Sequence, residues 1–157
     1  MTEYITKEGM NRLQKRLNEL VYDERPIVVQ QIQTARELGD LKENAEYHAA
    51  REKQRHIDNE IGKIKQRMGV LKVIDPSIIS KDAIRFGALV EVKEDGTDKA
   101  IKYNLIGVDE VYETDDPYTR ISIASPIGRA MIGKKVGEKF IVKAPIGDRH
   151  FVVCSIK

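Results

Sequence analysis

Tryptophan is absent from the sequence, and phenylalanine and tyrosine together make up only 6% of its 157 residues. Charged residues, by contrast, make up 33% of the chain. This balance does not favour one large globular interior and is typical of long helices exposed to solvent. No apolar run approaches the roughly 18 residues that a membrane span requires, so no membrane partner is expected.

Cysteine occurs once, at Cys154, which excludes an internal disulfide. The chain opens without a charged and then apolar leader, and we therefore expect a soluble, cytoplasmic protein. The sequence also lacks a glycine-rich phosphate loop, a Cys-x-x-Cys pair and a Gly-x-Ser-x-Gly elbow, which removes support for nucleotide-binding, zinc-ribbon and serine-hydrolase functions. The formal net charge is only +2, so any affinity for nucleic acid has to come from a local basic patch.

Apolar residues recur at steps of three and four from about Thr6 to Leu38, the spacing that predicts a helix. Gly39 follows, where a helix-ending residue in the left-handed region is wanted. Pro26 lacks a backbone donor and interrupts the run, so a bend or a locally loosened turn is expected there. A second run with the same spacing predicts a helix from about Glu43 to Val70.

The two predicted helices are related by their numbering. If the chain folds back on itself, facing residues have position numbers with a constant sum. The sum is 81 for Leu13 with Met68, Leu17 with Ile64 and Leu20 with Ile61, and 82 for Ile32 with Ala50. Half of 81 falls at Asp40 and Leu41, beside the turn signal Gly39-Asp40. We therefore predict an antiparallel coiled-coil hairpin with an acidic tip near residues 39–43, which reaches about 45 to 50 Å over some thirty residues.

After Pro76 the pattern changes to short runs rich in β-branched residues, which predict strands. These runs are Ala88 to Lys93, Ala100 to Val108, Thr119 to Ala124, Lys139 to Lys143 and Arg149 to Ser155. Ser125 and Pro126 predict the start of one short helix that ends near Ile132. The expected fold class is α+β: a hairpin domain over residues 1–75, a linker over 76–82, and a small domain over 83–157 with an antiparallel sheet.

Asp40 and Glu43 are the candidate catalytic residues, and two roles are open to them. In the first, Asp40 caps the second helix and Glu43 completes a capping box. In the second, the two carboxylates serve as ligands for Mg²⁺, which proteins usually hold through one or two carboxylates together with waters and substrate phosphates. Such a pair binds Mg²⁺ weakly alone, so a partner's active site has to complete the site. That arrangement suits two-metal phosphodiester chemistry.

Basic residues flank the predicted tip and could contact a single-stranded nucleic-acid backbone. They are Arg36, Lys42, Arg51, Lys53 and Arg55. The alternative is a solvated helix face neutralised by nearby glutamates. Tyr47 could stack on a base or pack against the facing helix.

His48, Glu52 and His56 lie at steps of four, a spacing from which a zinc site could be built. No third His or Cys lies nearby, and Lys and Arg surround this face, so we do not favour that interpretation. Ser125 is interpreted as a helix cap rather than as a nucleophile.

Two segments resemble the Gre family of bacterial transcript cleavage factors, and the resemblance extends over the full length. The first is ARELGDLKENAEYHAARE, Ala35 to Glu52, and the second is SPIGRAMIGKKVGE, Ser125 to Glu138. The resemblance implies a coiled-coil hairpin followed by an FKBP-like domain. It also implies a monomer that is not itself an enzyme, binds bacterial RNA polymerase and inserts its hairpin through the secondary channel. There it stimulates the polymerase's own cleavage of a backtracked RNA 3′ end.

The resemblance also assigns roles to residues. Asp40 and Glu43 match the tip acidic pair that helps to hold a second Mg²⁺ at the polymerase catalytic centre, with no ion stably bound by the factor alone. Arg51 matches a basic position near the extruded RNA. Ser125 and Pro126 match the loop that docks on the channel rim.

Three other functions remain open at this point. The chain could be a Gre-like inhibitor that occupies the secondary channel without promoting cleavage, although the intact acidic pair argues against it. The FKBP-like domain could catalyse prolyl isomerisation, but its half of the chain offers only three phenylalanines and three tyrosines to line such a pocket. Finally, the hairpin could be an adaptor whose tip sequence is unimportant.

Overall fold

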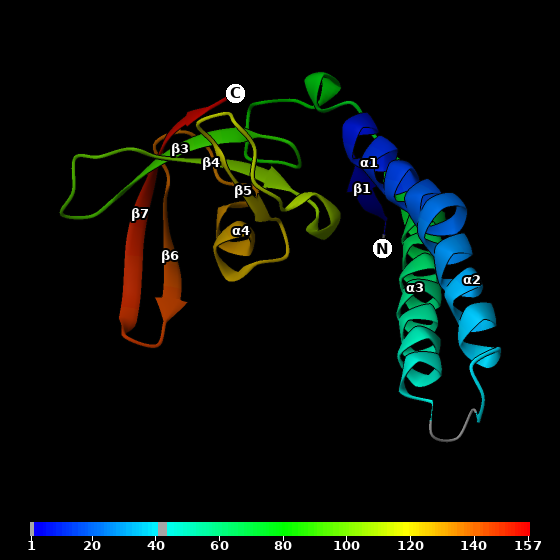
Figure 1. Ribbon diagram of the computed structural model, residues 1–157. Coiled ribbons are helices and arrows are strands. Elements are labelled where there is room, and N and C mark those ends of the chain that lie inside the picture. The colour runs from blue at the N-terminus through cyan, green and yellow to red at the C-terminus, as the bar shows by residue number, and fades with distance from the viewer. Residues whose placement is uncertain (1, 41–43) are drawn as a thin grey trace. The chain divides into compact units, whose positions relative to one another are not determined.

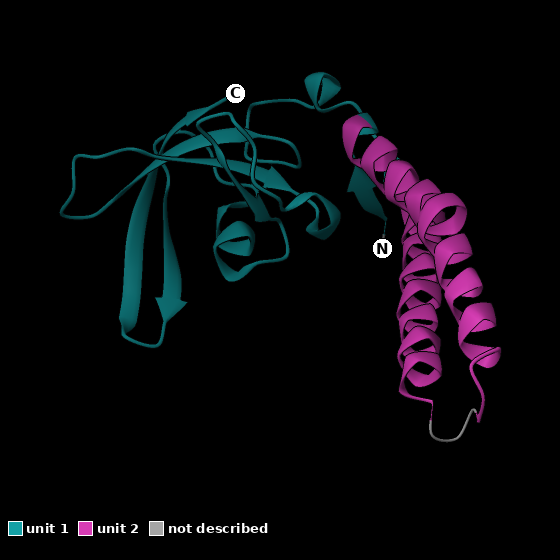
Figure 2. Ribbon diagram, viewed as in Figure 1, with its two compact units in different colours: residues 1–7, 72–157 teal, residues 8–71 magenta. Residues whose placement is uncertain are grey.

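The computed structural model describes residues 2–40 and 44–157, and the chain divides into two compact units (Figures 1 and 2). One unit is the helical hairpin, residues 8–71. The other joins residues 1–7 to residues 72–157 and contains the main sheet. The predicted α+β class is therefore confirmed. The predicted boundaries at 75 and 83 differ from this division, because the first residues of the chain belong to the sheet unit.

The first arm of the hairpin consists of three helical segments in series, and the second arm is one long helix. The segments are α1 (Lys7–Asn18), the π-helical η1 (Glu19–Glu24), α2 (Arg25–Arg36) and α3 (Ala45–Val70). In Figure 1, α2 and α3 lie side by side as the antiparallel pair that the numbering predicts. The 26 residues of α3 span about 39 Å. The start at Ala45 rather than at Glu43 accounts for about 3 Å of the difference from the expected 45 to 50 Å.

A narrow apolar seam joins the two arms. Its buried members are Leu20, Val28, Ile32, Ala50, Ile57 and Ile64, and partly buried Leu13, Leu17, Tyr47, Ile61 and Met68 pack against them. All eight residues of the constant-sum pairs belong to this set. The faces of both helices that the constant-sum pairs predict are therefore confirmed.

Pro26 produces the loosened turn that the sequence predicts. Because proline has no N–H, the α-helical bond from residue 26 to the carbonyl of Tyr22 cannot form. The chain widens here into the π-helical η1, and the Arg25 N–H bonds the carbonyl of Leu20, five residues back. A π-helical turn accommodates one extra residue. One extra residue in the first arm raises the pairing sum by one, which agrees with 81 on one side of η1 and 82 on the other.

Ion pairs cross the hairpin beside this segment. The Arg16 guanidinium donates to both carboxylate oxygens of Glu60 on α3, at 2.7 and 3.0 Å, and also to Glu24 at the end of η1. The Arg25 Nε donates to the Asp58 Oδ1 at 2.8 Å. Arg16 lowers the pKa of the Glu60 carboxyl, chiefly through their hydrogen bonds. These groups are about 40% exposed, so they supplement the apolar seam rather than replace it.

The sheet unit contains a five-stranded sheet in the order β5-β4-β3-β7-β6 (Figure 1). The strands are β3 (Leu89–Glu94), β4 (Ile101–Ile106), β5 (Thr119–Ser122), β6 (Lys139–Ala144) and β7 (Gly147–Ile156), and α4 (Pro126–Met131) is the one short α-helix of the described part of this unit. All five predicted strands and the predicted helix are present. The sheet is not wholly antiparallel, because β4 and β5 run parallel. Its likeness to an FKBP domain stays a prediction.

The core of this unit lies between the sheet and α4. Val90, Leu105 and Met131 are fully buried in it, and the rings of Phe140 and Phe151 stack with centroids 5.1 Å apart. Two 3₁₀ turns complete the unit: η2 (Pro76–Ile78), inside the predicted linker, and η3 (Val108–Glu110).

A small second sheet, for which the sequence has no signal, consists of β1 (Glu3–Ile5) paired with β2 (Leu71–Val73). The Ile74 N–H donates to the Ile5 carbonyl at 2.9 Å. Beside this pair, the carboxylate of Glu110 is fully buried and accepts hydrogen bonds from the Thr6 N–H, at 3.0 Å, and from the Thr6 hydroxyl. Glu110 therefore holds the N-terminal segment in the sheet unit.

Candidate functional site at the hairpin tip

Local signals on both arms position the tip. Gly39 follows α2 with φ +126°, a conformation that side chains rarely adopt, so the glycine allows the first arm to end there. On the other arm, Asn44 is the N-cap of α3: its Oδ1 accepts from the Tyr47 N–H at 3.1 Å. Its Nδ2 donates to the Ala35 carbonyl at 2.7 Å, so the same side chain ties the two arms together.

This geometry corrects one of the two roles considered for Asp40. The capping position belongs to Asn44 and not to Asp40, because the helix begins two residues later than the sequence suggested. Asp40 is exposed. Lys42 and Glu43, the other predicted residues of the tip, lie outside the described residues. Capping of α3 therefore does not explain a carboxylate at position 40.

A shallow depression of about 390 Å³ lies at the tip. Leu38, Asp40, Asn44, Ala45 and Glu46 line it. Glu46 is one of the nearby glutamates that the sequence suggests only as neutralising neighbours of the basic residues, yet it lines the same depression as Asp40. Its position in the first turn of α3 could have indicated this, because that turn lies directly after the predicted tip.

Carboxylate oxygens are the ligands that Mg²⁺ prefers in proteins, so Asp40 and Glu46 fit a hard cation by their chemistry. Within residues 2–40 and 44–157, His, Cys, Asp and Glu side chains form no group of three or more that could hold a metal ion. Whether Asp40 shares an ion with a partner therefore stays a prediction.

Of the predicted basic residues, the structure brings Arg36 and Arg51 together. Both line a depression of about 340 Å³ between α2 and α3. Lys53 lines another depression, which also contains Ala35 and Glu46. Arg55 instead pairs with Glu52, and this lowers the pKa of the Glu52 carboxyl.

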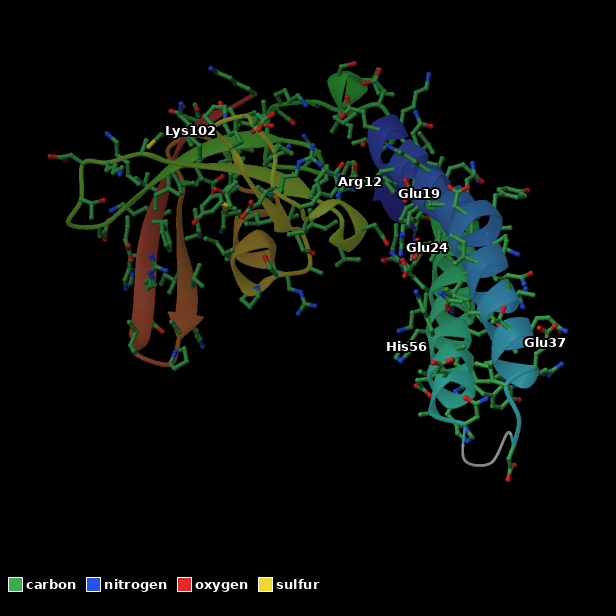
Figure 3. All side chains as sticks on the ribbon, in the orientation of Figure 1. Arg12, Glu19, Glu24, Glu37, His56 and Lys102 are labelled. Atoms are coloured by element: carbon green, nitrogen blue, oxygen red, sulfur yellow. The ribbon has the colours of Figure 1, made fainter. Side chains whose placement is uncertain are left out.

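Tyr47 and His56, two other residues considered in the sequence analysis, contact side chains of the hairpin itself. Tyr47 is half-buried and packs on the hairpin seam, the second of its two considered roles. The His56 Nε2 lies 3.1 Å from the Glu52 Oε1, and Glu52 also pairs with Arg55. Glu37, directly after α2, and His56 on α3 are both exposed (Figure 3).

Ser125 and Pro126 form the start of α4 in the sheet unit. The Ser125 hydroxyl accepts from the Gly128 N–H at 3.1 Å and donates to the Ser122 carbonyl at 2.7 Å, which confirms the predicted cap. Gly128 is required by this packing, because a Cβ there would lie 2.2 Å from the Ser122 carbonyl oxygen. Pro126 is exposed beside the cap.

The chain is a two-unit protein in which a helical hairpin with an exposed acidic tip is joined to a small sheet unit. Comparison with known proteins identifies its family. Residues 3–73 match the family described as transcription elongation factor, N-terminal, and residues 79–157 match transcription elongation factor, GreA/GreB, C-terminal. The chain therefore belongs to the GreA/GreB family of transcription elongation factors.

Curated relatives agree with this assignment along the whole length. Transcription elongation factor GreA of Acidiphilium cryptum is 40% identical over 153 residues, which cover 98% of this chain and 96% of the relative. GreA of Rhodospirillum rubrum is 42% identical with the same coverage. GreA of Thermodesulfovibrio yellowstonii is 42% identical over 99% of this chain and 98% of the relative. None of the described helices is both long enough and apolar enough to cross a membrane.

Proposed function

We propose that this chain binds bacterial RNA polymerase, inserts its hairpin through the secondary channel and stimulates the polymerase's own cleavage of backtracked RNA. The factor donates Asp40 and Glu43 in trans and is not itself a nuclease. Family membership supports the elongation role. The observation that supports the proposal is the capping of α3 by Asn44, because the start of this helix then does not require the carboxylate of Asp40.

The chemistry follows from the position of the carboxylate. Asp40 is exposed at the end of a narrow two-helix arm, which suits insertion into a channel of another protein. When bound, a second Mg²⁺ lowers the pKa of a water and stabilises the charge that develops during phosphodiester cleavage. Asp40 and Glu43 would hold that ion through their carboxylate oxygens. Asn44 orients the tip by its bonds to both arms.

The basic residues complete the proposed interface with RNA. Arg36, Arg51 and Arg55 lie on the described part of the hairpin. Together with Lys42, which the sequence analysis assigns to the tip, they would contact phosphates of the extruded RNA. Exposed Pro126, beside the cap of α4, would contact the rim of the channel together with the loop that Ser125 stabilises.

The test uses an assembled, backtracked elongation complex and the full-length factor. Asp40→Asn and Glu43→Gln keep the size of each side chain and remove its charge. We expect each to reduce stimulated cleavage by about 10- to 100-fold, and to raise the Mg²⁺ concentration needed, while binding to polymerase is unchanged. Glu37→Gln is the matched control, since it removes a charge near the tip from a residue without a proposed role.

Unchanged cleavage by both tip variants would overturn the mechanism. A wild-type factor that binds polymerase and slows elongation, but produces no cleavage at any Mg²⁺ concentration, would instead identify a channel-occupying inhibitor.

A further inference from the structure

A buried charged group contacts the chain just before the hairpin begins. Glu110, the last residue of η3, is the one charged side chain that is fully buried among residues 2–40 and 44–157. Its Oε2 accepts from the Thr6 N–H at 3.0 Å, and its Oε1 accepts from the Thr6 hydroxyl. Thr6 directly precedes α1, the first segment of the hairpin. The proposed tip chemistry makes no use of this carboxylate.

Packing does not explain why a carboxylate occupies this position. Burial removes the hydration of a carboxylate, and an apolar side chain of similar size would fill the space without that loss. What the carboxylate adds is direction, because its two oxygens bind two donors of the same residue in a defined geometry. Glu110 is therefore best explained as an attachment point for Thr6.

The attachment of Thr6 matters because the small second sheet depends on β1. Ile5 in β1 is fully buried, and the ring of Tyr4 lies 5.9 Å from the ring of Phe86. β2, in contrast, has no buried residue. It pairs with β1, and the Ile74 N–H that follows it donates to the Ile5 carbonyl at 2.9 Å. β1 thus anchors both of the chain segments that lead into and out of the hairpin.

The backbone that carries Glu110 is itself held in place. The Arg120 Nη1 donates to the Glu110 carbonyl at 3.2 Å, and the guanidinium carbon of Arg120 lies 4.5 Å from the ring centroid of Tyr112. Gly107, directly before η3, allows β1 to approach closely, because a Cβ there would lie 3.0 Å from the Tyr4 carbonyl oxygen. The carboxylate therefore projects from a fixed point toward Thr6.

We infer that Glu110 is a positioning residue for stimulated cleavage. By holding Thr6, it fixes within the sheet unit the segment from which the first arm starts and, through β1, the segment to which the second arm returns. Without its carboxylate, docking through Ser125 and Pro126 persists, but these segments move more freely. The tip carboxylates then spend less time in the reacting position, which lowers the rate of cleavage. This inference rests on the proposed function and adds to it a residue outside the hairpin.

The experiment measures cleavage in an assembled backtracked complex against the concentration of the full-length factor. It yields a maximal rate and a half-saturating concentration, after subtraction of the polymerase's intrinsic cleavage. Glu110→Gln replaces one acceptor oxygen with an NH₂ group, so it cannot accept from both donors of Thr6. We expect the maximal rate to fall about tenfold, because misplacement of a reacting group lowers the rate of the bound complex. The half-saturating concentration should stay within about twofold of the wild type, since docking is retained.

Three further variants separate positioning from stability. Val90→Ala shortens a fully buried core side chain of the sheet unit and so destabilises it, but should leave the maximal rate unchanged at a temperature where the variant is folded. Thr6→Ser keeps both donors to Glu110 and should retain the wild-type rate. Thr6→Val removes only the hydroxyl and should give an intermediate rate.

Amide hydrogen exchange of the free factor tests the attachment directly. In Glu110→Gln, the amides of Thr6 and Ile74 should exchange about tenfold faster than in the wild type, because the bonds that hold β1 are weakened. The amides of β3, in the main sheet, should change less. Equal acceleration in both places would indicate a general loss of stability and would overturn the inference.

The cleavage measurements can overturn the inference in three ways: an unchanged maximal rate in Glu110→Gln, an equal loss in Val90→Ala, or a raised half-saturating concentration with an unchanged maximal rate. The last result would mean that Glu110 acts on docking. If circular dichroism shows that Glu110→Gln is unfolded, Thr6→Val is judged by the same criteria. Absence of cleavage with the wild type would contradict the proposed function, and the inference with it.

Discussion

The hairpin and the sheet unit are stabilised in different ways. In the hairpin, buried side chains form one narrow seam, flanked by ion pairs that are about 40% exposed. In the sheet unit, side chains from the sheet and α4 enclose a core in which Val90, Leu105 and Met131 have no exposed surface. The hairpin therefore leaves most of its side chains at the surface, where they are available for contacts with other molecules.

The effect of a substitution should depend on the unit in which it is made. At Gly87 and Gly128 in the sheet unit, an added methyl group would lie within 3 Å of a neighbouring atom and would have to displace it. On the hairpin, the same added group often meets open space. Changes in the sheet unit should thus alter stability first, and changes near the tip should alter function first.

The sharpest test of the comparison places the same substitution in both units. Gly87 in the sheet unit has φ +80°, and a Cβ there would lie 2.6 Å from the Pro76 Cβ. Gly87→Ala should therefore lower the free energy of unfolding by about 2 to 4 kcal/mol. Gly62 lies within α3, where an added Cβ meets nothing within 4 Å. Gly62→Ala should raise stability by about 0.8 to 1 kcal/mol. Urea unfolding followed by circular dichroism measures both free energies. Changes of the same sign in the two variants would contradict the difference between the units.

The second prediction concerns the buried carboxylate of Glu110. Thr6→Val keeps the shape of the side chain but removes a hydroxyl that donates to Glu110. Because the carboxylate is fully buried, water cannot replace the lost bond, and we expect a loss of about 1 to 3 kcal/mol in urea unfolding. Thr34→Val on the exposed surface of α2 is the control, expected to lie within about 0.5 kcal/mol of the wild type. Equal effects of both variants would show that Glu110 does not depend on Thr6.

The third prediction tests whether the tip couples stability to function. Asn44→Ala removes the cap of α3 and should cost about 1 kcal/mol. Transcript cleavage should fall as well, because the same side chain positions the tip. Asn44→Asp retains an oxygen for the Tyr47 N–H but loses the donor to Ala35, so it separates the two bonds. Full cleavage by Asn44→Ala would mean that the cap does not orient the tip.

The smallest effect is expected for the ion pairs of the hairpin. Arg16 lowers the pKa of Glu60 below its ordinary value of 4.5 in the folded state. The pair therefore contributes stability above about pH 4.5, and this contribution is lost as the pH falls through the lower, folded-state pKa. Arg16→Gln should cost less than about 1 kcal/mol at neutral pH and nothing at pH 2, since both groups are largely exposed to solvent. Urea unfolding between pH 7 and pH 2 measures this, and an equal cost at both ends would contradict it.

The sequence predicted the hairpin well because its apolar residues repeat with the helical period and pair at a constant sum. Leu17 with Ile64 and Leu20 with Ile61 required only that two helices fold back, and Pro26 marked the π-helical turn through its missing N–H. The strands of the sheet unit were predicted almost as well, since β-branched runs between turn residues carry a local signal.

The features that the sequence did not predict depend on contacts between distant residues. β1 has only three residues, and it forms because β2, some seventy residues later, pairs with it. The buried carboxylate of Glu110 depends on Thr6, 104 residues away. At the tip, Asn44 and Asp40 are both good capping residues, and only the actual start of α3 decides between them. The parallel pairing of β4 and β5 has no periodic signature that distinguishes it from an antiparallel pair.

Because β1 pairs with β2, the chain segments at both ends of the hairpin belong to the sheet unit. The chain leaves the sheet unit after Lys7 and returns to it at Lys72, so residues 8–71 are inserted into that unit rather than appended to its end. Insertions are tolerated where the two ends of the inserted segment lie close together, as they do on paired strands. The hairpin is thus an exchangeable cassette: replacing residues 8–71 with the matching segment of another family member should transfer its tip chemistry while keeping this chain's own sheet unit.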